Sequence, residues 1–526
     1  MLHLGLIWHA ESTPRVLFTP LGSHSNAHKS RVDDTKQQYN IDKHINMKVE
    51  ETAAAIQATL GPDKQKKTSL VIETIQAKCS ESTNLILEQI NYAINDFGAT
   101  GKLKATVLSG GWTNYSYRVY LDKDPDLCVF AKLSFESASW NPDKTARFDL
   151  VRTQNEYNIM KQFSEVEPEY MVSPLACWDV EQDGKKMKLI VSEWSKAEEQ
   201  LSNQFIEGSV DPRIAPKLAH ALASLHTMQF DPNFNDEIMP YRESMLGGIK
   251  STLTEMASNT EPKNRTETYC SMLGKDVVNK IIDITAADDK KRECLQHRDT
   301  HTFNLLIEPR LTLPRRAVEA KSSVQDLQSF GENGHVIICD WEMAGAGPHG
   351  IDVGIVMTWP VACMVAHTLS GKEDACEDVA KFLESFLSSY SAKMMEGGLT
   401  QEDLTILYRR SVAWCGWFCF SAFHVGGCFI DASPCEDKEY IRDAMGVIGL
   451  QAARFYDYAY LPESTPLDEL KDLFRSLVNV ELKRAKSVFT SSKRRRQSRK
   501  CSLDAALMRI GEDSLCQGIL GRQLSQ

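Results

Sequence analysis

Cysteine pairs in the Cys-x-x-Cys spacing are absent from this chain of 526 residues, although it contains 14 cysteines. Zinc ribbons require such pairs, so this class of metal site is not expected, and scattered cysteines are typical of reduced thiols in the cytoplasm. A recognisable secretory signal is also missing, because the apolar start, residues 2–8, is too short for one. We therefore expect a cytoplasmic protein, in which the glycosylation sequons at Asn114 and Asn264 carry no information.

Basic residues are outnumbered by acidic ones: 60 lysines and arginines stand against 71 aspartates and glutamates, for a formal net charge of −11. This balance argues against a general nucleic-acid binder. Residues 411–430 form a long apolar run, but His424 and several small or polar residues interrupt it, so stable membrane insertion is not expected. The hydrophobic content of 42% is sufficient for a sizeable core in two to four domains.

Acidic and amide side chains occur together in two stretches that each contain a short apolar strand. The first stretch carries His297, Asp299 and Asn304 on a loop that precedes its strand. The second begins with its strand and then presents Asp340 and Glu342. Strands that bring carboxylates and an amide together form an oxygen-rich site suited to magnesium. A further aspartate that accepts a proton completes the set of groups that phosphoryl transfer needs.

The spacing His-x-Asp-x-x-x-x-Asn, followed by a strand that ends in aspartate, resembles the catalytic and metal loops of the protein-kinase-like fold. It is most similar to the branch that phosphorylates small molecules, the aminoglycoside phosphotransferase and choline kinase superfamily. The resemblance implies that Asp299 is the catalytic base, that Asn304, Asp340 and Glu342 hold Mg²⁺, and that His297 supports the loop. Asp-x-Glu in place of Asp-Phe-Gly, and the absence of an Ala-Pro-Glu segment, point away from protein kinases.

A glycine-containing turn precedes these motifs, between two expected strands. Gly110 and Gly111 allow the backbone to approach a phosphate closely, with its N–H groups turned inward. The sequence Leu-Ser-Gly-Gly-Trp-Thr-Asn resembles the nucleotide loop of choline kinase and its relatives, with Asn114 in the matching place. This similarity implies that ATP is the phosphoryl donor.

Further candidates for the nucleotide site follow along the chain. Lys132 is the only charge in an apolar strand, and Glu156 lies in the helix after it, as expected for the lysine–glutamate pair that positions the phosphates. By resemblance, Glu193 and Trp194 occupy the hinge where main-chain groups bind adenine. Trp140 belongs to an insertion similar to one in methylthioribose kinases, where it would line the mouth of the cleft.

Two later segments resemble methylthioribose kinases more specifically. The Gly-Pro-x-Gly-x-Asp pattern is similar to theirs, and it implies that Asp352 anchors the catalytic loop. Arg409 and Arg410 match an arginine pair that reaches the sugar site, and His301 also matches, so these three are candidate substrate-binding residues. Asn304 departs from the pattern, because methylthioribose kinases have serine there.

The resemblance implies an ATP- and Mg²⁺-dependent kinase of a small molecule, most specifically of 5-methylthioribose at its anomeric hydroxyl, a step of methionine salvage. Choline or ethanolamine kinase, or another metabolite kinase similar to aminoglycoside phosphotransferases, remains an alternative. An aromatic, acidic pocket would favour choline or ethanolamine, because aromatic faces bind quaternary ammonium groups. A second alternative is a binding module related to kinases but without activity.

The fold implied is α+β and bilobal, with a small β-rich N-lobe behind a helical preface and a larger helical C-lobe. In the preface, Ile86, Leu87 and Ile90 share an apolar face that we expect to pack beneath the N-lobe. Ser498 and Ser502 follow basic residues and are candidate phosphorylation sites, and a homodimer is left open. The expected domains are a disordered leader (1–46), a helical extension (47–98), the N-lobe (99–196), the C-lobe (197–480) and a basic disordered tail (481–526).

Overall fold

The computed structural model describes residues 86, 87, 90, 103–108, 114–136, 149–182, 184–195, 197, 199–234, 239–308, 336–425 and 429–492. Predictions for the leader, most of the helical extension, Gly110, Gly111, Trp140, Ser498 and Ser502 lie outside these residues. The described residues divide into two compact units. The first unit comprises the described residues up to Asn158 together with Val172–Ser195. The second unit comprises Ile159–Met171 and the described residues from Lys196 onward. The second unit resumes at Lys196, next to the place where the sequence analysis ends the N-lobe, but residues 159–171 also belong to the second unit.

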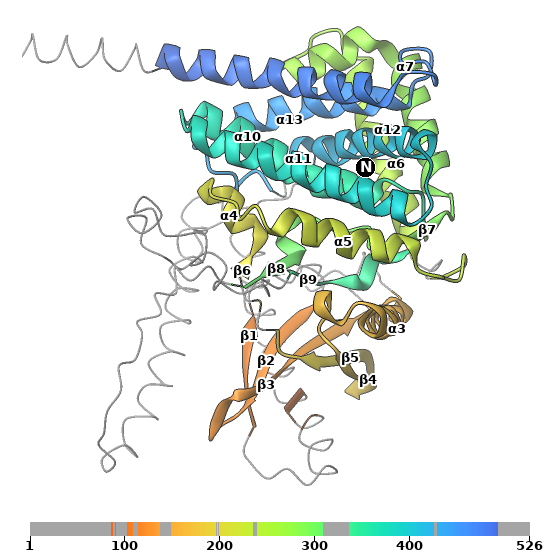
Figure 1. Ribbon diagram of the computed structural model, residues 1–526, viewed down its shortest axis with the longest axis vertical. Helices are drawn as coiled ribbons and strands as arrows, with labels where there is room; N and C mark the ends of the chain where they lie inside the picture. Colours follow the sequence, from red (N-terminus) through yellow and green to blue (C-terminus); the bar gives the residue numbers. More distant parts are fainter. Residues whose placement is uncertain are drawn as a thin grey trace, which may run out of the picture. The chain divides into compact units, whose positions relative to one another are not determined.

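The first unit contains a five-stranded antiparallel sheet in the order β1-β2-β3-β5-β4 (Figure 1). Alternate residues of its strands face one core, as the two-residue repeat of a strand requires: Tyr115, Tyr117 and Val119 of β2 are buried there. Ile86 and Ile90 belong to the same core, so their predicted packing against this unit is confirmed. The strands are β1 (Leu103–Leu108), β2 (Tyr115–Leu121), β3 (Asp124–Phe135), β4 (Pro174–Gln182) and β5 (Lys185–Glu193).

The second unit is mainly helical. Its helices are α4 (Leu201–Glu207), α5 (Ile214–Thr227), α6 (Met239–Ala257), α7 (Arg265–Asp289), α10 (Ile351–Leu369), α11 (Glu373–Glu396), α12 (Gln401–Phe418) and α13 (Lys438–Ala453). Helix α3 (Val151–Val166) begins in the first unit and ends in the second. A mixed helix-and-sheet chain with an antiparallel sheet is thus confirmed, in agreement with the α+β prediction.

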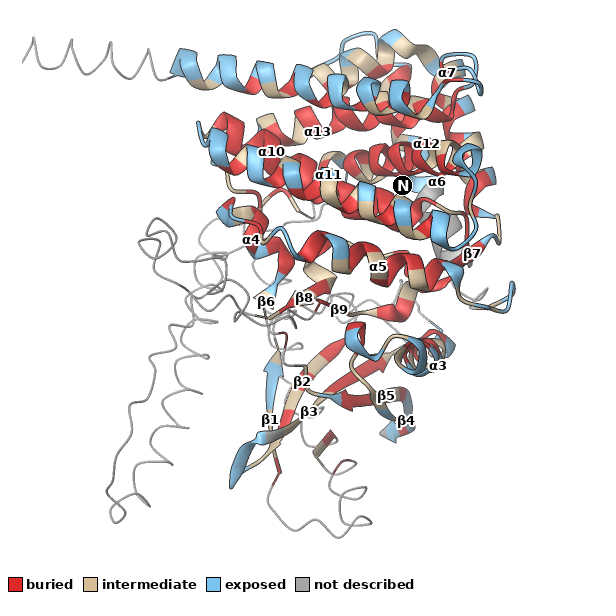
Figure 2. Cartoon of the chain, viewed as in Figure 1, coloured by how far each residue is buried: buried red, intermediate tan, exposed pale blue. Residues whose placement is uncertain are grey.

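Helix α10 is the apolar centre of the second unit, and all of its residues are buried (Figure 2). By length and composition it is the one helix of the described residues that could cross a membrane, but it is enclosed by the rest of the unit. Helix α11 packs beside it, and so does α12, which begins with a capping box of Thr400 and Asp403.

Two small antiparallel sheets flank the predicted catalytic loop, because β7 precedes the loop and β8 follows it. One has the order β6-β8-β9, with strands Glu199–Gln200, Leu305–Ile307 and Val336–Ile338. The other pairs β7 (Cys294–Gln296) with β10 (Gly345–Gly347). The pairs β8–β9 and β7–β10 join the two motif stretches, because each pair takes one strand from each stretch.

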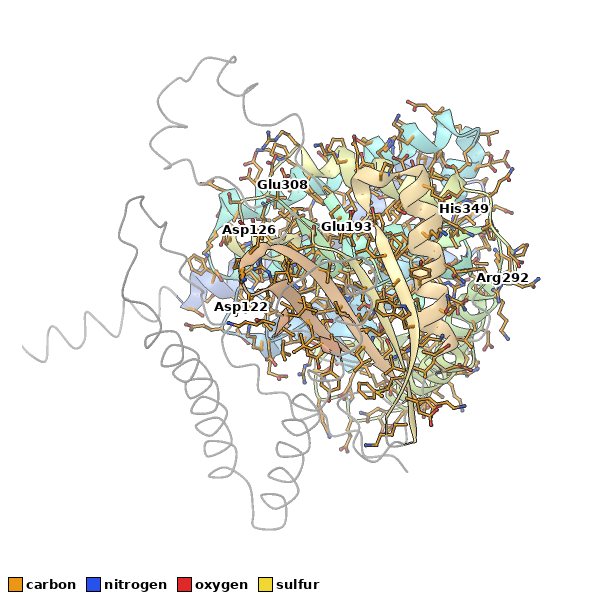
Figure 3. All side chains as sticks on the ribbon, turned by 90° about the horizontal axis from the view of Figure 1, so that it is seen from below. Asp122, Asp126, Glu193, Arg292, Glu308 and His349 are labelled. Atoms are coloured by element: carbon orange, nitrogen blue, oxygen red, sulfur yellow. The ribbon has the colours of Figure 1, made fainter. Side chains whose placement is uncertain are left out.

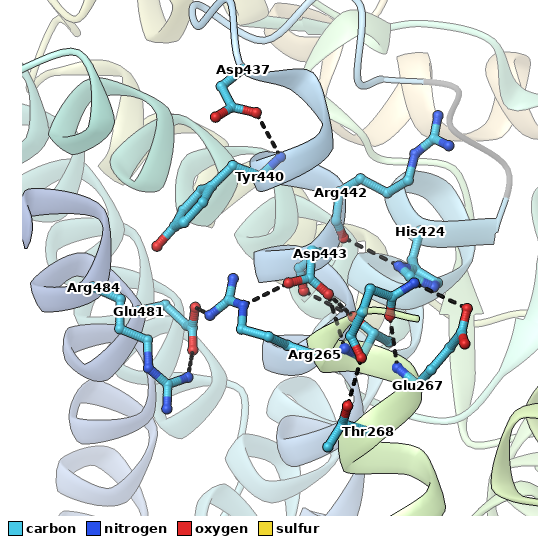
Figure 4. A network of polar contacts seen from close by, with 12 residues as sticks. Arg265, Glu267, Thr268, His424, Asp437, Tyr440, Arg442, Asp443, Glu481 and Arg484 are labelled. Carbon is cyan, nitrogen blue, oxygen red and sulfur yellow. Dashed lines mark hydrogen bonds and ion pairs between the residues drawn. The ribbon is translucent and has the colours of Figure 1, made fainter. Parts of the chain in front are cut away.

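A final helix covers residues 467–492 and corrects one boundary. The disordered tail was predicted to begin at residue 481, but Glu481 and Ala485 are buried in this helix. Glu481 accepts hydrogen bonds from Arg265 at 2.7 Å, and Arg265 also contacts Asp443 at 2.6 Å (Figure 4). The amphipathic pattern of the helix therefore extends past the point where the composition becomes basic.

Candidate active site

Pairing of β8 with β9 brings the two motif stretches together. Leu305 lies opposite Ile338, and the backbone N–H of Cys339 donates to the carbonyl of Asn304 at 2.9 Å. Asp340, which follows Cys339 directly, therefore leaves its strand beside the end of the loop that carries Asp299. The site combines a loop and a strand that are separated in sequence by the segment 309–335.

Asn304 is held against Asp299. Its side-chain nitrogen donates to the backbone carbonyl of Asp299 at 3.0 Å and to its carboxylate at 3.1 Å. Because the nitrogen is directed at Asp299, the amide oxygen of Asn304 is the atom that could coordinate a cation. This contact positions the predicted base through a residue five positions further along the same loop.

The carboxyl group of Asp299 has a raised pKa. Burial is the main cause; His301, with its Nε2 atom 3.5 Å from the carboxylate, lowers the pKa, while the charges of Asp340 and Glu342 raise it again. The side chain is nevertheless 32% exposed, so it is reachable from solvent. A partly accessible carboxylate with a raised pKa is suited to accept a proton from an alcohol.

The predicted metal ligands present only oxygen donors. Asp340 and Glu342 are close enough to shift the pKa of Asp299, and Glu342 is 6% exposed. Two carboxylates and an amide oxygen are the donor chemistry that Mg²⁺ prefers, with water and phosphate oxygens completing the shell. Within the described part of the chain, no group of three or more histidine, cysteine, aspartate and glutamate side chains could hold a metal ion.

Backbone strain is concentrated at this site. Among the described residues, the non-glycine residues with positive φ are Arg298, at 66°, and Asp340, at 63°. This left-handed conformation costs about 1–2 kcal/mol for a residue with a side chain, so the surrounding contacts must maintain it. The sequence analysis did not predict the left-handed backbone of Arg298, because the spacing of residues within a motif does not indicate the sign of φ.

Asp352 supplies such contacts. Its carboxylate accepts hydrogen bonds from the backbone N–H groups of His297 and Arg298, each at 2.7 Å, and from Nε2 of His226 at 3.0 Å. His226 in turn contacts the hydroxyl of Tyr390 at 2.6 Å through Nδ1. Asp352 thus makes the contacts with the loop backbone that an anchor requires. It also connects to His226 and Tyr390, which the sequence analysis missed.

The protons of this buried chain can be assigned. Burial lowers the pKa of His226 and raises that of Tyr390. Burial also acts to raise the pKa of Asp352, but hydrogen bonds from the His226 side chain and the His297 backbone hold it low. Asp352 is therefore an ionised acceptor, so neutral His226 donates from Nε2 and accepts at Nδ1 from Tyr390. In both contacts of His226, a donor therefore faces an acceptor.

His297 connects the loop to the strand that precedes Asp340. Its Nε2 atom contacts the carbonyl of Cys339 at 2.9 Å, and its ring packs edge-on against Trp341, with centroids 4.6 Å apart. Burial lowers its pKa, so the ring is neutral. These contacts agree with the supporting position predicted for His297.

The first unit contains the predicted lysine–glutamate pair. The ammonium of Lys132 lies 2.9 Å from both carboxylate oxygens of Glu156, and the two residues are 6% and 3% exposed. Nearby, the side-chain oxygen of Asn114 accepts from Arg152 at 3.2 Å. A buried, charge-assisted pair of this kind fixes the position of the ammonium group.

The predicted hinge residues lie at and after the end of β5. Glu193, labelled in Figure 3, is exposed. The backbone N–H of Glu193 donates to the carbonyl of Ser173 at 3.0 Å. Trp194 lies beneath the guanidinium of Arg118, 4.9 Å from the ring centroid. The backbone N–H of Glu193 is thus engaged within the sheet, and Arg118 is a neighbour that sequence reasoning missed.

Arg409 does not have the position predicted for it. It is 2% exposed, and its guanidinium donates to the backbone carbonyls of Phe455, Leu461 and Pro462 at 2.6–3.1 Å. The prediction that Arg409 binds substrate is therefore wrong: the arginine satisfies carbonyl groups of the segment that follows α13. The sequence pattern could not distinguish an arginine that faces a site from one that faces backbone carbonyls of a later segment.

Arg410 faces a different environment. It pairs with Glu293 and approaches Asp288 at 3.5 Å. Against the effect of burial, hydrogen bonds from His349 and the charge of Arg410 lower the pKa of Glu293 to about 2. With two carboxylates as partners, Arg410 has most of its charge compensated by its own unit.

An aromatic ledge, which we define as His301, Phe303, Trp359, Phe423 and Phe429, adjoins the predicted base. Phe303 stacks on Phe429, with centroids 5.0 Å apart, and packs against Trp359 at 4.9 Å; His301 packs on Phe429 at 5.1 Å. Three of the rings are partly exposed. The ledge joins the predicted catalytic loop, α10 and the region after α12, so no local pattern in the sequence could reveal it.

Comparisons with known proteins identify no family for the chain. No family model matches it, and no curated protein does. Among solved structures, a microcompartment-associated aminopropanol kinase is similar with a TM-score of 0.38 and 10% sequence identity, over 69% of this chain and 94% of that chain. A likeness this weak supports no conclusion about activity, so the chemistry must follow from the residues of the site.

Proposed function

We propose that the protein is an ATP-dependent phosphotransferase that acts on a hydroxyl group of a small molecule, with a protein-kinase-like, bilobal fold. The observation that carries this proposal is the arrangement of Asp299. Its carboxylate accepts a hydrogen bond from Asn304, and the strand after Asn304, β8, pairs with β9, the strand that precedes Asp340. A proton acceptor next to an oxygen-rich set of ligands is the combination that phosphoryl transfer to an alcohol requires.

Each residue has a definite part in this proposal. Asp299 orients the acceptor hydroxyl and takes its proton as the new bond to phosphorus forms. Asp340, Glu342 and the amide oxygen of Asn304 would hold Mg²⁺, which supplies neutralisation of phosphate charge when bound. Lys132, kept in place by Glu156, provides a cation for the phosphates of ATP.

The acceptor that we propose first is 5-methylthioribose, phosphorylated at its anomeric hydroxyl. The support is the motif resemblance around Asp352, whose carboxylate does bind the backbone of the loop. The arginine pair no longer supports this substrate through Arg409, because that side chain is enclosed by backbone carbonyls.

A second candidate is an amino alcohol such as choline or ethanolamine. The specific observation in its favour is the aromatic ledge, whose His301 lies 3.5 Å from the carboxylate of Asp299. Partly exposed rings beside carboxylates suit an ammonium group, since its charge is attracted to the faces of the rings.

Both candidates can be tested by ATP turnover of the full chain with Mg²⁺ and a panel of 5-methylthioribose, choline, ethanolamine, homoserine and an aminoglycoside. Asp299→Asn should reduce turnover by about 10²–10⁴-fold, because the amide cannot accept the proton. The matched control is Asp283→Asn, an exposed aspartate of α7, which should leave turnover unchanged.

The outcome separates the candidates. Turnover of 5-methylthioribose alone supports the salvage reaction, and turnover of an amine alone supports the second candidate. Equal turnover by Asp299→Asn and the unaltered protein would contradict the proposed base. ATP binding without turnover of any acceptor in the panel would favour a binding module related to kinases.

A further inference from the structure

Arg298 directly precedes the predicted base, Asp299, and its own side chain is enclosed in the second unit. Its guanidinium donates to the backbone carbonyl of Ala346 in β10, and its Nη1 atom lies 3.7 Å from the carboxylate of Asp289. The side chains of Arg298 and Asp289 are each 1% exposed, so the two charges are buried together. This pair joins the residue before the base to the end of α7.

The end of α7 is itself held in place. Asp289 is the last residue of this helix. Its neighbour Asp288 accepts hydrogen bonds from the indole nitrogen of Trp414 in α12, at 3.1 Å, and from the hydroxyl of Tyr456. The Nζ atom of Lys291 lies 2.8 Å from the other carboxylate oxygen of Asp288. The partner of Arg298 therefore belongs to a helix end that contacts two later segments of the chain.

Gly347 of β10 leaves the space that the guanidinium occupies. A Cβ at this position would lie 2.9 Å from Nη2 and 3.2 Å from Nε of Arg298. It would also lie 3.1 Å from Cγ of Gln296. Because a protein interior is close-packed, a methyl group here must displace the guanidinium. The atoms that must move belong to flexible side chains, so we expect Gly347→Ala to fold.

We propose that Arg298 is a positioning residue for Asp299: its buried contacts with Asp289 and Ala346 hold the loop backbone from which the predicted base projects. This inference rests on the proposed phosphotransferase function. The positive φ of Arg298 is unfavourable for a residue with a side chain, so other contacts must maintain it. Asp352 binds the backbone N–H of Arg298, and the guanidinium supplies the second set of contacts. A guanidinium suits this position because its planar donors can engage a carbonyl and a carboxylate together.

The first variant is Arg298→Gly in the full chain. Glycine adopts a positive φ without strain, so this change removes the guanidinium and leaves the backbone conformation accessible. We expect kcat to fall by about 10–100-fold, because a displaced base reacts poorly. The KM for ATP should not change, since Lys132 and Glu156 are unaltered. Amide hydrogen exchange of residues 297–304, followed by mass spectrometry, should become about tenfold faster.

The second variant, Gly347→Ala, keeps both buried charges and displaces only the side chains that meet the added methyl group. It should lower kcat and speed exchange of the loop in the same direction as Arg298→Gly. Added to Arg298→Gly, it should cause no further loss, because the guanidinium that it displaces is already gone. A full additional loss in the double variant would contradict action through the guanidinium.

The matched control is Arg265→Gln. Arg265 also belongs to the second unit and contacts two carboxylates, those of Asp443 at 2.6 Å and Glu481 at 2.7 Å. Its loss should lower the melting temperature without changing kcat or the exchange of residues 297–304. A fall in kcat as large as that of Arg298→Gly would show an effect of general stability and would overturn the proposal.

Unchanged kcat and unchanged loop exchange in Arg298→Gly would also overturn it. The exchange measurement needs no substrate, so its outcome is independent of the phosphotransferase reaction. Equal turnover by Asp299→Asn and the unaltered protein would contradict the proposed function, whereas slow exchange that persists in Arg298→Gly contradicts the positioning by Arg298. The two failures are therefore distinguishable.

Discussion

At the scale of single residues, Asp352 has an influence larger than its size suggests. It is fully buried and ionised, and it receives two backbone N–H groups and the imidazole of His226. A buried carboxylate is destabilising unless hydrogen bonds satisfy its lone pairs. Removal of the Asp352 charge, or of a group that donates to it, should therefore lower the free energy of unfolding. The left-handed backbone of Arg298 is maintained by the same hydrogen bonds.

Two substitutions should therefore have graded effects on the free energy of unfolding. Asp352→Asn should cost about 3–5 kcal/mol, because each carboxylate oxygen accepts one backbone N–H group and the NH₂ that replaces one oxygen can only donate. Tyr390→Phe removes one O–H donor to His226 and should cost about 1 kcal/mol. Denaturant unfolding measures both changes. Equal costs for the two variants would contradict the assignment of Asp352 as the central acceptor of these hydrogen bonds.

At the scale of elements, two glycines decide how α12 and α13 approach each other. A Cβ at Gly416 would lie 2.5 Å from the backbone nitrogen of Ala453 and 2.6 Å from the carbonyl oxygen of Gly449. A Cβ at Gly449 would lie 2.7 Å from the carbonyl oxygen of Gly416. The two backbones are in direct contact, so the position of α13 depends on the absence of side chains at this crossing.

Gly416→Ala should lower the free energy of unfolding by about 1–3 kcal/mol, since a helix backbone must move to accommodate the methyl group. The control is Gly247→Ala in α6, where no atom of the described residues lies within 4 Å of an added Cβ. That change should stabilise the protein by about 0.5–1 kcal/mol, because alanine is the better helix former. Thermal melting of both variants measures the difference, and a loss of stability in Gly247→Ala as large as in Gly416→Ala would refute it.

At the scale of the whole molecule, neutral histidines are distributed through the core of the second unit. His226, His297 and His367 are each at most 3% exposed, and burial lowers the pKa of all three. They belong to α5, the predicted catalytic loop and α10. Unfolding exposes them together, so their protonation is coupled to the stability of the unit.

The stability should fall as the pH is lowered from 7 to 5. Unfolded histidines bind protons below about pH 6.5 while the buried ones stay neutral, so the unfolded state gains protons and is favoured. Each histidine contributes up to about 1.4 kcal/mol per pH unit, and this stability is complete above pH 6.5. Denaturant unfolding across this range gives the slope.

The control for the pH slope is His367→Gln. Its Nε2 atom contacts the carbonyl of Phe205 at 2.7 Å, a contact that the amide of glutamine can replace. The slope of this variant should be smaller by about one proton. A stability that does not change between pH 7 and 5 would refute the coupling.

Several features could be predicted from the sequence because they depend on short spacings. The strand that carries Lys132 and the helix that carries Glu156 follow from such patterns, and the resemblance to kinase-like folds implied their ion pair, which is present. The position of Arg409 could not be predicted, because its partners lie 46 to 53 residues away and are backbone carbonyls, which every sequence contains. The contact between His226 and Asp352 spans 126 residues and has no local pattern either.

By itself, the sequence determined the strands, the amphipathic helices and the order of polar residues on the loops, since these follow from the two- and 3.6-residue repeats and from the spacing within a motif. Only the tertiary structure decided which side chains meet: that Asn304 turns to Asp299, that Arg409 is enclosed, and that the rings of the aromatic ledge gather beside the predicted base. The physical reason is that helix packing sets these distances, and it depends on the combined shape of many side chains.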